Sequence, residues 1–122
     1  MRFVHENLEI WQLAIELSSR IYKLTEKFPS EEKFGLTAQS RRAVVSIALD
    51  IAEGSGRHSK KDFSNFLNRA ITSLQETDTC LKIAIRLNYI TEQDYQIIAP
   101  LIEKLYFKLI AFNKKVRNEI AK

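Results

Sequence analysis

Residues 41–57 read RRAVVSIALDIAEGSGR and contain the pattern that decides the fold. At about 100° per residue, five polar side chains of residues 39–53 share one thin strip: Gln39, Arg42, Ser46, Asp50 and Glu53. Alanine and branched aliphatic residues surround the rest of the wheel. The pattern predicts a helix from just after Ser30 to Glu53, irregular near Gly35 and more buried than any other in the protein.

Three further helices are predicted on either side of this segment. The first runs over residues 5–28 and stops at Pro29, which disfavours the α conformation of the residue before it. The third covers residues 59–88 and the fourth covers residues 91–117, each opening on a Ser/Thr-x-x-Asp capping pattern. Pro100 lies inside the fourth helix and predicts a kink there.

Composition agrees with a helical protein of one domain. The chain has 122 residues but only three Gly and two Pro, too few turn formers for a many-stranded sandwich or barrel. With 45% hydrophobic and 28% charged residues, it is also unlike a disordered chain. Short connections make neighbouring helices antiparallel, so residues 1–122 predict one all-α domain, an up-down-up-down four-helix bundle.

Cysteine content and hydropathy bear on the compartment. Cys80 is the single cysteine, so no internal disulfide can form. The first nine residues lack the apolar region of a signal peptide, and no apolar stretch is long enough to span a membrane. These features predict a cytoplasmic protein with no membrane partner.

Two helices carry more apolar surface than one bundle core requires. In residues 5–28 the apolar arc exceeds half of the helix circumference, which predicts self-association into a homo-oligomer. In the fourth helix, a second apolar stripe lies away from the core stripe and predicts an interface: Tyr106, Phe107 and Ile110.

Arg41 lies on the apolar side of the second helix, where an unpaired guanidinium would be costly. Asp78 interrupts the apolar face of the third helix. The sequence therefore predicts a structural ion pair between Arg41 and Asp78, with pairing of Arg41 to another subunit as the alternative.

The predicted topology gathers positive charge at one end of the bundle. That end holds eight Lys or Arg against four Asp or Glu, an excess equal to the net charge of the whole chain, +4. Clustered cations beside a helix N-terminus favour contact with nucleic-acid phosphates. The candidate contacts are Arg57, His58, Lys60, Lys61, Lys114, Lys115 and Arg117. The alternative is that these charges only solvate the bundle.

Catalytic patterns are weak by comparison. Metal-binding bundles pair a Glu with a His three residues later on each of two helices, and neither His5 nor His58 has such a Glu. No nucleophile, base and orienting group converge in the predicted topology. The sequence predicts a non-enzymatic protein without a metal or cofactor.

Several motifs together resemble one known family. They are Leu8–Gln12 (LEIWQ), Phe28–Leu36 (FPSEEKFGL), Arg41–Ile47 (RRAVVSI) and Ile51–Gly54 (IAEG) followed by Arg57. The chain resembles the 23S ribosomal RNA intervening-sequence proteins from Leu8 to about Val116. That resemblance implies a left-handed four-helix bundle assembled into a ring-like homo-oligomer, a pentamer, whose biochemical function is poorly defined.

The same family is similar to the accessory variability determinant of diversity-generating retroelements, a basic pentameric bundle that binds nucleic acid and a reverse transcriptase. This similarity favours RNA or DNA as a partner. The competing hypothesis is a protein-interaction scaffold that docks a partner protein on the stripe of Tyr106, Phe107 and Ile110, with no role in nucleic-acid binding.

Overall fold

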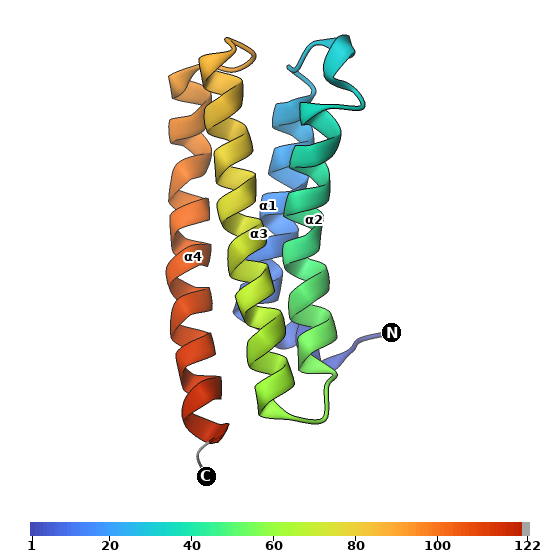
Figure 1. The fold of residues 1–122 in the computed structure, drawn as a ribbon, viewed down its shortest axis with the longest axis vertical. Coiled ribbons are helices and arrows are strands. Elements are labelled where there is room, and N and C mark those ends of the chain that lie inside the picture. Colours follow the sequence, from blue (N-terminus) through green and yellow to red (C-terminus); the bar gives the residue numbers. More distant parts are fainter. Residues whose placement is uncertain (121–122) are drawn as a thin grey trace.

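The computed structural model describes residues 1–120 and contains four long helices (Figure 1). Their bounds are α1 Glu9–Thr25, α2 Leu36–Ser55, α3 Lys60–Arg86 and α4 Glu92–Ile120, with short 3-10 turns at Val4–Asn7 and Ser30–Glu32. The α2–α3 connection lies at the end of the bundle opposite the other two connections, so consecutive helices run in opposite directions (Figure 1). The predicted all-α bundle is confirmed.

The first two helices start later than the sequence predicts. Leu8 is extended, with φ −77° and ψ 127°, and separates the first 3-10 turn from α1, which then ends at Thr25 rather than Phe28. Gly35, with φ −106° and ψ −114°, separates the second turn from α2. Glu32 Oε1 accepts a hydrogen bond from the Leu36 N–H at 2.9 Å, so Glu32 caps the start of α2.

The starts of α3 and α4 follow the predicted capping patterns. Ser59 Oγ accepts the N–H of Asp62 at 3.1 Å. Thr91 and Asp94 form a reciprocal pair in which each side chain accepts the backbone N–H of the other, at 2.9 and 3.0 Å. α4 then continues through Pro100 to Ile120.

All four helices contribute fully buried aliphatic side chains to one core: Leu17, Ile21, Ile47, Ile51, Leu67, Leu74, Leu81, Leu105 and Leu109. α2 is buried on its inward face but not around its whole circumference, because Leu49 is 61% exposed. No helix within residues 1–120 has both the length and the apolar character needed to cross a membrane.

α2 and α3 form the most extensive helix pair, and they approach each other closely at Gly54. A Cβ added there would lie 2.7 Å from the Cβ of Phe66 and 2.9 Å from Cδ1 of Phe63. Gly54 is buried inside α2, one residue before its end. The missing side chain therefore lets the two helices meet just before the connection of residues 56–59.

Gly54→Ala is expected to destabilise the protein by about 1–3 kcal/mol, because the new methyl group overpacks the α2–α3 contact. Chemical denaturation measures the change in the free energy of unfolding. Gly56→Ala is the matched control: its Cβ would lie 3.7 Å from the nearest atom, and φ is −87°. That variant is expected to be neutral or up to about 1 kcal/mol more stable. Equal losses in both variants would contradict the close approach.

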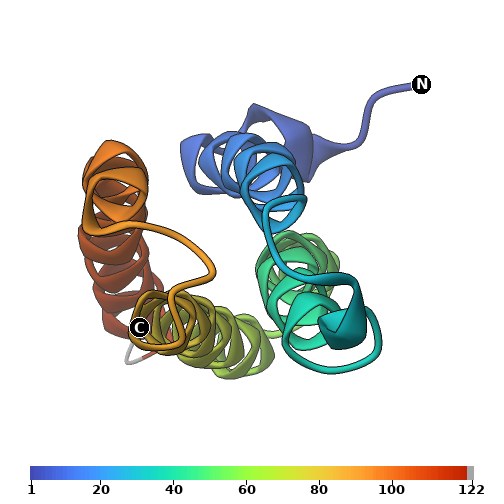
Figure 2. The ribbon, with the colours of Figure 1, turned by 90° about the horizontal axis from the view of Figure 1, so that it is seen from above.

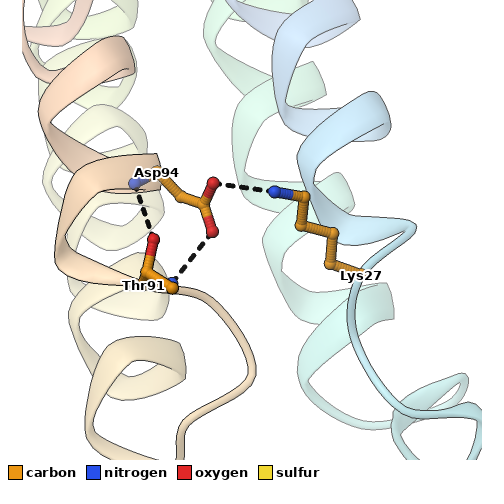
Figure 3. A network of polar contacts seen from close by, with 3 residues as sticks. All are labelled: Lys27, Thr91 and Asp94. Atoms are coloured by element: carbon orange, nitrogen blue, oxygen red, sulfur yellow. Dashed lines mark hydrogen bonds and ion pairs between the residues drawn. The ribbon is translucent and has the colours of Figure 1, made fainter.

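α1 and α4 stand farther apart than the other neighbouring helices when the bundle is viewed along its axis (Figure 2). Polar contacts connect them along their length. Lys27 Nζ lies 2.7 Å from Asp94 Oδ1, and Lys108 Nζ lies 3.0 Å from Glu9 Oε1. Arg20 Nη2 donates to the Ile97 carbonyl at 3.3 Å. Figure 3 shows Asp94 joining Lys27 to the Thr91 cap of α4.

The Lys27 hydrogen bond, followed by that from the Thr91 backbone, holds the pKa of the Asp94 carboxyl below its ordinary value. Asp94 therefore contributes stability above its unfolded-state pKa, and that contribution is lost as pH falls through the lower folded-state pKa. Asp94→Asn is expected to reduce the pH dependence of the free energy of unfolding in that acidic range. Thermal melts between pH 2 and 6 measure it; an unchanged pH dependence would contradict the network in Figure 3.

Candidate nucleic-acid interface

The predicted basic residues gather at one end of the bundle. Arg57 and His58 lie in the α2–α3 connection, and Lys60 and Lys61 form the first turn of α3. The C-terminal part of α4 reaches the same end (Figure 1) and carries the other three, Lys114, Lys115 and Arg117. All seven side chains are exposed. The topology thus brings residues some 55 positions apart to the same end of the bundle, and their contact with nucleic acid stays a prediction.

Two of the seven basic side chains already have acidic partners. Arg57 Nη2 lies 3.0 Å from Glu53 Oε1, and Lys60 Nζ lies 3.3 Å from Glu119 Oε2. The remaining five have no ion pair within residues 1–120: His58, Lys61, Lys114, Lys115 and Arg117. Exposed cations without a carboxylate partner can neutralise an external phosphate without first breaking an internal pair.

Phe66 holds two arginines beside this end. The guanidinium carbons of Arg57 and Arg69 lie 4.8 and 5.0 Å from the centroid of the Phe66 ring. Arg69 also acts on Asp50 of α2. Burial raises the pKa of the Asp50 carboxyl, and the positive charge of Arg69 partly opposes that rise. Arg69 is not among the residues predicted from the sequence, although its i, i+3 spacing from Phe66 on one helix is a usable signal. Cation–π contact restricts both guanidinium groups before any ligand arrives.

A chain of polar side chains, buried at Ser64 and Asn113 and exposed at Asn68, joins α3 to α4 behind the basic surface. Ser64 Oγ donates to Asn113 Oδ1 at 2.7 Å, and Asn113 Nδ2 donates to Asn68 Oδ1 at 2.8 Å. Asn113 is only 3% exposed. Because its amide is bonded on both sides, these contacts set the position of Lys60 and Lys61 relative to the α4 lysines. The sequence offers one indication of this contact, because Asn113 is a polar residue beside the core stripe of the fourth helix.

The N-terminus of α3 adds a positive partial charge at the same surface, since the backbone N–H groups of a first helical turn point outward along the axis. Ser59 satisfies the N–H of Asp62 in this turn. Asp62 is also exposed and opposes the local positive charge. The net positive charge of the surface therefore comes mainly from its lysines and arginines.

The predicted ion pair between Arg41 and Asp78 does not form within one chain. Arg41 Nε donates to Thr25 Oγ1 at 2.9 Å, and its guanidinium lies 4.6 Å from the Tyr22 ring. Asp78 instead accepts the Tyr95 hydroxyl and pairs with Lys82 Nζ at 2.7 Å. Arg41 contacts α1 whereas Asp78 contacts α4, so the two side chains leave their helices toward different neighbours.

The second stripe of α4 is exposed, as the sequence predicts. Phe107 is 61% and Ile110 40% exposed, while Tyr106 is half-buried and meets the edge of Phe107 at 5.4 Å between ring centroids. On α1, Ile15 and Tyr22 remain 45% and 43% exposed. The apolar surface that predicts assembly is thus left uncovered within one chain, and its role as an interface stays a prediction.

Potential metal ligands are scattered. Within residues 1–120, no three His, Cys, Asp or Glu side chains converge in a way that could hold a metal ion. His58 lies in the basic connection and His5 stacks against Phe3, with ring centroids 5.8 Å apart. The chemistry offered by the basic end is therefore charge pairing and hydrogen bonding by its cations.

The chain matches the model of a known protein family. The model of the 23S rRNA-intervening sequence protein family matches residues 6–111. The chain belongs to this family. The match covers all of α1, α2 and α3 and most of α4. It includes Arg57, His58, Lys60 and Lys61, whereas Lys114, Lys115 and Arg117 lie beyond it.

A solved structure supports the same family assignment. The chain is similar to a protein of unknown function from the S23 ribosomal protein family of Bacteroides thetaiotaomicron, with 30% sequence identity and a TM-score of 0.76. The alignment covers 86% of this chain and 98% of that one. Among curated proteins, comparison finds no match.

Proposed function

We propose that this member of the 23S rRNA-intervening sequence protein family is a non-enzymatic homo-oligomer that binds RNA or DNA through phosphate. The observation that carries the proposal is the basic end, where five of seven predicted contact side chains have no acidic partner within residues 1–120. Counterion release rewards each phosphate that such a surface neutralises.

The proposed oligomer is a pentameric ring, as the family resemblance implies. Uncovered apolar side chains on α1 and α2 support assembly, because Ile15, Tyr22 and Leu49 are 45%, 43% and 61% exposed. A ring repeats the basic end in every subunit, so weak phosphate contacts act together and raise the apparent affinity.

Reversing two lysines at the basic end tests the binding surface. Lys60→Glu with Lys61→Glu is expected to weaken binding to mixed-sequence RNA and DNA at least about tenfold and to reduce the salt dependence by about 0.9 per lost phosphate contact on duplex DNA. Fluorescence anisotropy over a range of salt concentrations measures both quantities.

The matched control reverses two exposed lysines near the opposite end, Lys23→Glu with Lys33→Glu. It changes the net charge by the same amount and is expected to preserve most of the affinity. Light scattering on each variant checks that the oligomer remains intact. Equal weakening by both pairs would show that net charge, and not the basic end, determines binding.

A second function is favoured by the exposed stripe of Tyr106, Phe107 and Ile110, namely a scaffold that docks a partner protein. A clustered aromatic surface of this kind is typical of protein interfaces. In that case Tyr106→Ala abolishes recovery of a specific partner in a pull-down, while reversal of Lys60 and Lys61 leaves nucleic-acid retention unchanged. The nucleic-acid proposal expects the opposite result from both variants.

A further inference from the structure

A groove of about 490 Å³ runs between α3 and α4, away from the basic end. Its apolar lining includes Leu74 and Ile102, and aromatic rings line it from α4: Tyr95, Tyr106 and Phe107. The volume lies within the range of small-molecule sites. Neither the proposed phosphate contacts nor the exposed α1 side chains line this groove.

The charges in this groove are opposite in sign to those of the chain as a whole. Its two carboxylates, Asp78 and Glu103, are accompanied by no Lys, Arg or His among the lining residues, although the chain carries +4 overall. Glu103 is exposed and has no ion pair or side-chain hydrogen bond within residues 1–120. Carboxylates beside aromatic faces favour a cationic ligand.

One corner of the groove already holds an ammonium group that belongs to the chain. Lys82 Nζ lies 2.7 Å from Asp78 Oδ2 and 5.7 Å from the centroid of the Tyr95 ring. The hydrogen bond to Asp78 raises the pKa of Lys82, so its charged form is favoured. The Lys82 side chain is 61% exposed and can swing away into solvent.

Asp78 is held in place independently of Lys82. Its other oxygen, Oδ1, accepts a hydrogen bond from the Tyr95 hydroxyl, which connects α3 to α4 across the groove. An ionised carboxylate offers about four acceptor positions, so these two bonds leave capacity for a further donor. The site is therefore preorganised on one side and carries the unpaired Glu103 on the other.

We propose that the α3–α4 groove binds a small organic amine whose ammonium lies between Asp78 and Glu103 and whose apolar body packs over Ile102 and Phe107. The carboxylates select the positive charge, and the aromatic and aliphatic lining selects an apolar body over a fully hydrated cation. A ligand of this class displaces Lys82 from Asp78, or shares that carboxylate with it.

The test uses the intact oligomer and three probes of similar shape but different charge: 2-phenylethylammonium, neutral 2-phenylethanol and anionic 3-phenylpropionate. Isothermal titration calorimetry is expected to show saturable binding of the ammonium alone. Glu103→Gln is expected to weaken it about twofold to fivefold, and Asp78→Asn about tenfold. Glu16→Gln, which removes an exposed carboxylate of α1 outside the groove, is the matched control and is expected to bind normally.

Removing the internal cation gives a second readout that a general loss of folding cannot imitate. Lys82→Gln is expected to bind 2-phenylethylammonium about twofold to fivefold more tightly, because the ligand no longer competes for Asp78. Lys23→Gln makes the same charge change on α1 and is expected to have no effect. Equal binding of the three probes, or wild-type affinity in both Glu103→Gln and Lys82→Gln, would overturn the proposal.

Discussion

The close contact of α2 with α3 at Gly54 is the constraint on which the arrangement of this bundle depends. With no side chain at that position, the backbone of α2 meets Phe63 and Phe66 directly, and the chain reverses over the following few residues. The reversal places Arg57 and the first turn of α3 at one end, where α4 also terminates (Figure 1). The basic end thus follows from a packing requirement and not from any interaction between the basic residues, which repel one another.

The bundle uses two different kinds of contact to hold its helices. α2 and α3 pack through buried aliphatic side chains and a close backbone approach, whereas α1 and α4 are wider apart and are joined by ion pairs and hydrogen bonds along their length (Figure 2). Exposed ion pairs contribute little stability each. Both α1 and α4 also carry exposed apolar side chains that remain open to other molecules.

Charge is divided unevenly between surfaces of this small domain. The end of the bundle concentrates cations, two of which are restrained by Phe66, while the α3–α4 groove contains carboxylates and aromatic rings. The net charge of +4 belongs to the whole chain and does not give the local charge of either surface. Each of these surfaces includes aromatic side chains whose rings lie within cation–π distance of a positive group of the chain: Phe66 beside the basic end and Tyr95 in the groove.

The sequence by itself determined the four helices, the capping pairs at Ser59 and Thr91, and the clustering of basic residues at one end. The helices and their capping pairs depend on periodicity and local hydrogen bonding. The clustering of basic residues follows from the alternating direction of the helices, which their short connections impose. Only the tertiary structure decided the partners of Arg41 and Asp78, the two guanidinium groups on Phe66, and the capping of α2 by Glu32. A helical wheel gives the direction in which a side chain leaves its helix. It does not give which neighbouring helix lies there, or at what height, because packing of the whole core sets both.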